Sequence, residues 1–103
     1  LEPDDIHALL ITLEADLKVQ IPALSKSLES GVGSDAMHRQ LHAIKGMAGM
    51  LTREALHQAV AQADDAWRHS RPDTGRTLTQ ALLPWLDEWL AEVRDCLQRY
   101  SSG

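Results

Sequence analysis

Apolar side chains recur along this chain at intervals of three and four residues, the spacing of one face of an α-helix. The pattern is clearest over residues 34–51 and 52–68, and each segment carries a single apolar stripe. β-branched residues are few, and no alternation of period two points to a strand. The two segments predict antiparallel helices joined by a short turn. Their stripes are Met37, Leu41, Ile44, Ala48 and Leu51, and then Leu56, Val60, Ala63 and Trp67.

The first 33 residues predict a helix that is interrupted. A start near Pro3 is favoured because proline suits the first turn of a helix and the following acids suit its positive end. Pro22 is expected to kink or break this helix near residues 19–21. A second segment then ends at Gly31 and Gly33, which act as helix stops. The apolar positions are Ile6, Leu9, Leu10, Leu13 and Leu17 before the proline, and Leu24 and Leu28 after it.

Capping residues set the remaining boundaries. Ser34 or Asp35 is expected to cap the helix of residues 34–51, and Thr52 the next one. Residues 69–73 form a polar loop around a proline, and Asp73 or Thr74 caps the last helix. Pro84 lies inside this last helix and predicts a kink. Together the segments predict an all-α fold: an antiparallel four-helix bundle with an additional N-terminal helical segment, in one domain of residues 1–103.

Composition agrees with a small helical domain in a reducing compartment. The chain has 103 residues, of which 44% are hydrophobic, enough for one core. A single cysteine, Cys96, excludes an internal disulfide. No apolar run approaches the ~20 residues needed to cross a membrane, and no signal peptide is present. We therefore expect a cytoplasmic domain that does not insert into a membrane, such as the cytoplasmic end of a membrane-anchored sensor.

Charge narrows the classes of partner. The net charge is −5, with 10 basic and 15 acidic side chains and no basic cluster. This argues against nucleic acid, whose phosphates require a basic face. Residues 34–51 differ from the rest because they carry one acidic and two basic side chains, a net charge of +1.

Two glycines in the middle of this locally positive helix require an explanation. Each glycine costs about 0.5–1 kcal/mol of helix stability relative to alanine. At about 100° per residue, His42 lies roughly 140° from the apolar stripe, Gly46 about 180° and Gly49 about 120°. His42 is thus predicted to be exposed beside a patch cleared by the glycines, with Lys45 one turn along. A largely neutral imidazole can form a covalent intermediate, and a phosphoryl group on it would have a cation nearby.

The run His42-Ala43-Ile44-Lys45-Gly46, followed by a small residue at Gly49, resembles the signature of histidine-containing phosphotransfer (HPt) domains of bacterial two-component phosphorelays. The resemblance covers most of the chain and implies a helical bundle. It implies that His42 is the phosphoacceptor, through Nε2, that Lys45 assists the phosphate and that Gly46 leaves room. One departure is Thr52, where the family usually has glycine, so the turn geometry is expected to differ slightly.

The resemblance also implies the partners. HPt domains exchange phosphoryl groups with an aspartate on receiver domains, and the receiver supplies Mg²⁺, so this domain is expected to bind no cofactor. The chain has no nucleotide-binding glycine box and is too short for a kinase core. It is most similar to the C-terminal module of a hybrid sensor kinase, and the first residue, Leu1, suggests excision from a longer protein. As an isolated domain we expect a monomer.

The surface around His42 is expected to dock the receiver. Gln62 or Asp64, on the neighbouring helix, is a candidate to orient the second ring nitrogen of His42. Otherwise Asp64, Asp65 and Glu54 are expected to form a solvated face. The predicted docking residues are His38, Arg39, Gly46, Gly49 and Met50.

Other interpretations of the same residues remain open. An exposed histidine is usually ordinary surface, and the domain would then be a helical interaction module without phosphotransfer. His38 and His42, four residues apart, could hold a metal ion, although no third ligand is evident, so no metal site is expected. Close helix packing would explain the glycines only if they faced the core. Trp85 and Trp89 are expected in the core or at its margin.

Overall fold

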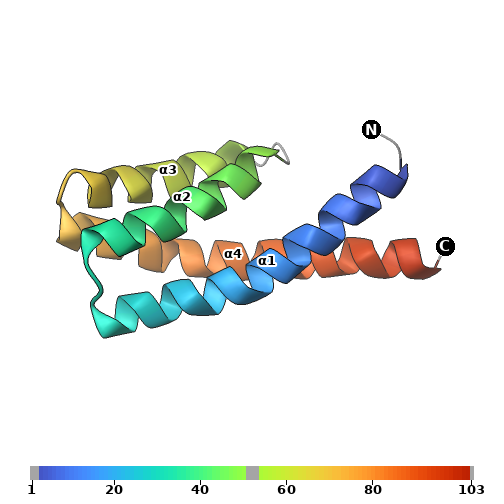
Figure 1. Cartoon of the computed structure of the whole chain (residues 1–103), viewed down its shortest axis with the longest axis horizontal. Coiled ribbons are helices and arrows are strands. Elements are labelled where there is room, and N and C mark those ends of the chain that lie inside the picture. The colour runs from blue at the N-terminus through green and yellow to red at the C-terminus, as the bar shows by residue number, and fades with distance from the viewer. Residues whose placement is uncertain (1–2, 51–53, 103) are drawn as a thin grey trace.

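The computed structural model describes residues 3–50 and 54–102, and these form four α-helices that alternate in direction (Figure 1). The helices are α1 (Pro3–Ser30), α2 (Ser34–Met50), α3 (Glu54–Arg68) and α4 (Pro72–Ser102). Each helix packs against the two next to it in a closed ring of four. No strand occurs in the described ranges. The predicted all-α, antiparallel four-helix bundle is therefore confirmed.

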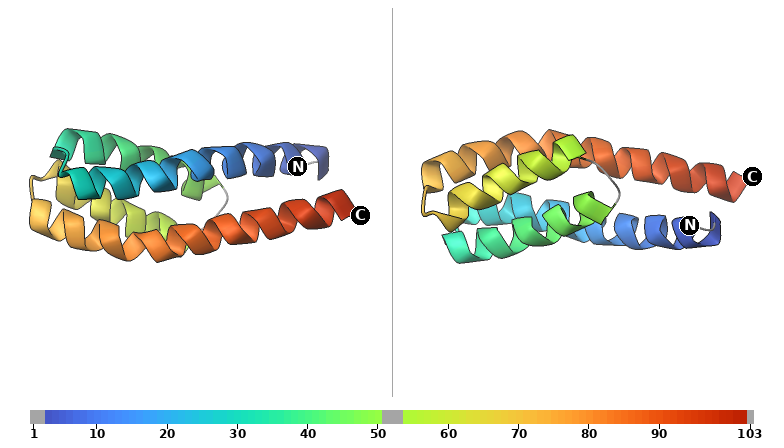
Figure 2. Two further views of the ribbon diagram at one scale, coloured as in Figure 1. Left: turned by 90° about the horizontal axis from the view of Figure 1, so that it is seen from below. Right: turned by 90° about the horizontal axis from the view of Figure 1, so that it is seen from above.

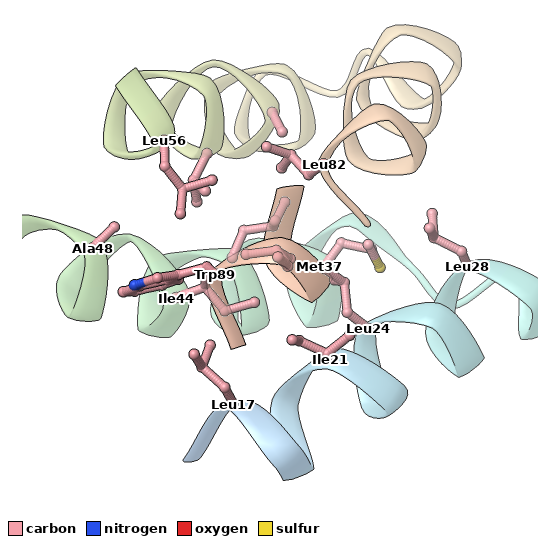
Figure 3. Packing of buried hydrophobic residues seen from close by; sticks show 14 of the residues in the cluster. Leu17, Ile21, Leu24, Leu28, Met37, Ile44, Ala48, Leu56, Leu82 and Trp89 are labelled. Carbon is pink, nitrogen blue, oxygen red and sulfur yellow. The ribbon is translucent and has the colours of Figure 1, made fainter. Parts of the chain in front are cut away.

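The apolar stripes of the four helices meet in one interior (Figure 3). Each fully buried leucine or isoleucine side chain contributes about 1.5–3 kcal/mol through the removal of apolar surface from water. The stripe of α2 is completely buried over its described part, so the core direction of α2 is the one inferred from the spacing. The core comprises Leu13, Leu17, Ile21, Leu24, Leu28, Met37, Leu41, Ile44, Ala48, Leu56, Val60, Ala63, Trp67, Leu82, Leu86, Trp89 and Val93.

Of the two outcomes expected at Pro22, a kink or a break, the break is absent, because α1 continues through the proline to Ser30. The side chain of Pro22 is exposed, whereas Ile21 and Leu24 on either side of it are buried. Packing on both sides of the proline keeps the segments in one helix, whose axis bends in Figure 1. The additional N-terminal segment is thus the first part of α1. Helix α4 likewise continues through Pro84.

Helices α1 and α4 are longer than the other two and extend beyond them at one end of the bundle (Figure 2). The two helices run antiparallel and side by side there, with both chain termini at this end. Arg94 on α4 donates from Nε to Oε1 of Glu14 on α1 over 3.2 Å. The molecule is accordingly elongated, with principal extents of 47 × 23 × 18 Å.

The turn between α1 and α2 agrees with its sequence. Gly31 has a φ of 67°, in the left-handed region that glycine adopts without strain, and α1 ends before it. Arg76 on α4 donates from Nη1 to the carbonyl oxygen of Leu28 over 2.8 Å and so satisfies one of the last carbonyls of α1. Helix α2 then begins at Ser34. The predicted cap at Thr52 lies outside the described residues.

Helix α4 begins at Pro72, earlier than the expected caps Asp73 and Thr74. Proline is well suited to the first turn because its missing N–H needs no partner there. The N–H of Gly75 donates to the carbonyl of Arg71 over 2.8 Å, which is the first helical hydrogen bond. The polar loop is therefore shorter than the predicted residues 69–73.

Gly75 is expected to resist substitution because the indole of Trp67 lies against it. Trp67 donates from Nε1 to Thr79 Oγ1 over 3.0 Å, and this hydroxyl donates to the carbonyl of Gly75 over 2.7 Å. A Cβ on Gly75 would lie 2.7 Å from Cε2 of Trp67. We predict that Gly75→Ala lowers the free energy of unfolding by about 1–3 kcal/mol, as overpacking does. Urea denaturation measures this, with Gly33→Ala as the control because open space surrounds Gly33; equal losses would contradict the prediction.

Candidate functional site

His42 is exposed on the outer face of α2. Its neighbours Leu41 and Ile44 are fully buried, so the histidine points away from the interior, as the angular count predicts. Leu41 and Ile44 anchor the helix beneath the imidazole. The side chain is thus presented to solvent from a rigid element.

Lys45 lies one turn along α2 from His42, and side chains three residues apart are neighbours on a helix surface. The lysine is partly buried at the edge of a surface cleft of about 330 Å³ between α2 and α3. Cations and carboxylates share this cleft, which is lined by Lys45, Ala61, Gln62, Asp64, Asp65 and Arg68. A lysine one helical turn from an exposed imidazole is a suitable neighbour for a phosphoryl group on that ring.

Asp64 does not lie on a solvated face and does not orient His42 directly, so both expectations for it are wrong. The residue is only 4% exposed. The Nδ1 atom of His38 on α2 donates a hydrogen bond to Oδ1 of Asp64. Gln62 is exposed, and no hydrogen bond joins it to His42 within the described part of the chain. The carboxylate of Asp64 therefore contacts His38, one helical turn before His42, and not His42 itself.

The ring of His38 stands between this carboxylate and the predicted phosphoacceptor. The ring centroids of His38 and His42 are 5.8 Å apart, and the ring planes are tilted by 43°. His38 is partly exposed, with a side-chain exposure of 34%. The side chain of His38 thus contacts Asp64 through one ring nitrogen and lies next to His42.

The two glycines have different surroundings. No heavy atom lies within 4 Å of the position that a Cβ on Gly46 would occupy, so Gly46 leaves open space beside His42. A Cβ on Gly49 would lie 3.3 Å from Cδ2 of His57 on α3. Gly49 is exposed, yet it also lets the His57 side chain approach α2, an interhelical role that was not expected from its angle to the core. Open space therefore surrounds Gly46, whereas His57 occupies part of the space at Gly49.

The structure also places the remaining docking residues and the two tryptophans expected in the core or at its margin. Arg39 is exposed on α2, whereas the side chain of Met50 lies outside the described part of the chain. Trp89 is buried, at 3% exposure, but Trp85 is 47% exposed and lies outside the core. Trp85 points outward because it lies one residue before the buried Leu86.

A second imidazole–carboxylate pair lies on the exposed surface near the end of α3. The Nδ1 atom of His69 is 3.1 Å from Oδ1 of Asp65, and Arg71 Nη2 is 3.3 Å from Oδ2. Exposed pairs of this kind contribute about 0–1 kcal/mol each. Among residues 3–50 and 54–102, no group of three His, Cys, Asp or Glu side chains is placed to hold a metal ion. His38 and His42 thus have no third protein ligand there.

Fold and site together define a helical domain that exposes the imidazole of His42 on the outer face of α2. The family model for Hpt domains matches residues 8–103, and the chain therefore belongs to the Hpt domain family. Its members are phosphotransfer domains of two-component signalling that interact with receiver domains and lack a kinase core. The comparisons with curated proteins and with solved structures return no match. None of the described helices combines the length and the apolar character needed to span a membrane.

Proposed function

We propose that this domain is a phosphorelay intermediate that accepts a phosphoryl group on His42 from a receiver aspartate and passes it to a second receiver. The observation that carries the proposal is the outward-facing imidazole of His42 beside the open space at Gly46. In the step, the Nε2 lone pair forms a bond to phosphorus. The bond from phosphorus to the aspartyl oxygen breaks, and its electron pair leaves with the carboxylate.

The roles of the surrounding residues follow from their places around His42. Lys45 stabilises the phosphoryl oxygens by its charge, one turn along the helix. Gly46 admits the partner's active site, and His38, Arg39, Gly49 and Met50 belong to the surface around it. Mg²⁺ comes from the receiver in this proposal, and the domain binds no cofactor of its own.

The proposal extends to the setting of the domain. We infer a cytoplasmic domain that is monomeric in isolation, most simply as the C-terminal module of a hybrid sensor histidine kinase. A separate carrier protein is the alternative. The sequence of the whole parent gene distinguishes the two, because a hybrid kinase would encode a kinase core and a receiver before this domain.

The acid stability of the transferred phosphoryl group, and the atom to which it is bonded, test the proposal. The domain is incubated with phosphorylated receivers and Mg²⁺, and the label on it is expected to be labile in acid, since it is held by an N–P bond. NMR is expected to place the phosphorus on Nε2 of His42. Addition of a second, unphosphorylated receiver should then remove the label. An acid-stable label, or receiver binding with no label, would instead support an interaction module without phosphotransfer.

A further inference from the structure

Asp64 is a buried carboxylate that the proposed function does not use. It lies on α3 with 4% exposure, and a carboxylate so shielded from water is stable only with a hydrogen-bonding partner. That partner is the ring of His38, which donates from Nδ1. The contact fixes the orientation of His38. Its second nitrogen, Nε2, lies on the far edge of the ring and therefore faces away from Asp64.

His42 is the neighbouring ring, one helical turn along α2 from His38. Two imidazoles joined by one N–H···N hydrogen bond have their centroids about 5 Å apart, since the bond spans about 3 Å between the nitrogens. The observed separation is 5.8 Å. The rings are thus neighbours that do not yet share a hydrogen bond, and the exposed side chain of His42 has room to rotate toward His38.

We propose that Asp64 and His38 form a proton relay that positions His42 for phosphoryl transfer. Asp64 accepts from Nδ1 of His38, and Nε2 of His38 accepts from Nδ1 of His42. This holds the proton of His42 on Nδ1 and leaves the lone pair on Nε2, facing the partner. The inference rests on the proposed function and assigns His38 and Asp64 as positioning residues within it.

The relay balances the charge of the transfer step. When Nε2 of His42 forms its bond to phosphorus, the aspartyl carboxylate leaves with the P–O electron pair and the imidazole becomes positive. The Nδ1 proton then moves to Nε2 of His38, whose positive charge is paired with the carboxylate of Asp64. In the onward step the proton returns to Nδ1, the N–P bond breaks and its electron pair returns to Nε2. No proton has to reach bulk water while a receiver covers the site.

The first test follows the tautomer of His42 by ¹⁵N NMR of the histidine-labelled domain. In the unaltered domain, His42 is expected to carry its proton on Nδ1. In His38→Ala it is expected to exchange between both tautomers, as an unconstrained imidazole does. His69→Ala is the matched control, because His69 also contacts a carboxylate, that of Asp65, but on the exposed surface. An unchanged His42 signal in His38→Ala would overturn the proposal.

The second test measures reactivity without a receiver, using phosphoramidate as the phosphoryl donor. His38→Ala and Asp64→Asn are each expected to slow phosphorylation at Nε2 of His42 at least about tenfold, which lies below the ~10²–10⁴ of a direct acid or base. Circular dichroism verifies the fold, and Asp64→Asn preserves the shape of the buried side chain. His69→Ala should react at the unaltered rate, and equal rates in all variants would overturn the relay.

This donor separates the relay from the proposed function. Suppose that the unaltered domain reacts with phosphoramidate, that both variants react more slowly, and that no receiver transfers a phosphoryl group to the domain. This result would support the relay and contradict the phosphorelay role. A domain that exchanges with receivers at the same rate in His38→Ala would contradict the relay alone.

Discussion

Replacing His42 with glutamine is expected to abolish phosphoryl transfer from a receiver to this domain while its fold stays intact. Glutamine has a high helix propensity and no nucleophilic nitrogen. His42 is exposed on the outer face of α2, so the free energy of unfolding should change by no more than about 0.5 kcal/mol. The measurement is transfer of label from a phosphorylated receiver in the presence of Mg²⁺, together with a denaturation curve.

His69→Gln provides the matched control for this prediction. His69 is exposed near the end of α3 and takes the same substitution, but it lies outside the proposed site. Its label should equal that of the unaltered domain. Label that persists in His42→Gln and disappears in another histidine variant would reassign the phosphoacceptor.

Replacing Gly46 with glutamine is expected to slow transfer from a receiver by about two orders of magnitude, the usual effect of displacing reacting groups by an ångström or more. Side chains on a helix lean toward its N-terminus, so a side chain at position 46 lies over the preceding turn. That turn carries His42. The variant should nevertheless be more stable than the unaltered domain by up to about 1 kcal/mol, because glycine is a poor helix former.

Two substitutions separate the steric effect from other causes. Gly46→Ala adds a Cβ where the structure has open space, so it should gain stability and keep most of the transfer rate. Gly46→Gln should also keep most of its reactivity toward phosphoramidate, which is far smaller than a receiver. Transfer from a receiver at the full rate in Gly46→Gln would show that the glycine is not there to admit a partner.

The fold was predictable wherever the signal was local and periodic. The four-three spacing of α2 placed Leu41 and Ile44 inside and His42 outside, and the structure agrees. Of the two outcomes expected at Pro22, only the break was wrong, because proline lowers the local stability of a helix, whereas the apolar residues on both sides of it pack against other helices. That packing depends on elements far away in the sequence.

The contacts of the site were harder to predict because they depend on the register between two helices. In an antiparallel pair of helices, positions at equal distances from the turn lie opposite each other. With the turn near residue 52, position 38 is expected to face about positions 64–66, and position 42 about positions 60–62. This register would have placed Asp64 opposite His38, as the structure does. Counting angles on α2 alone gave the direction of each side chain but not its neighbour.

The pairing of α1 with α4 at the end that holds both termini has a mechanical consequence. A force applied between the termini would separate the two antiparallel helices from their free ends, loading their side-chain contacts a few at a time rather than all together. Such unzipping requires less force than shearing two elements along their whole length. Helices α2 and α3 lie toward the other end of the bundle (Figure 2). The force would therefore reach them, and His42 on α2, only after the ends of α1 and α4 had separated.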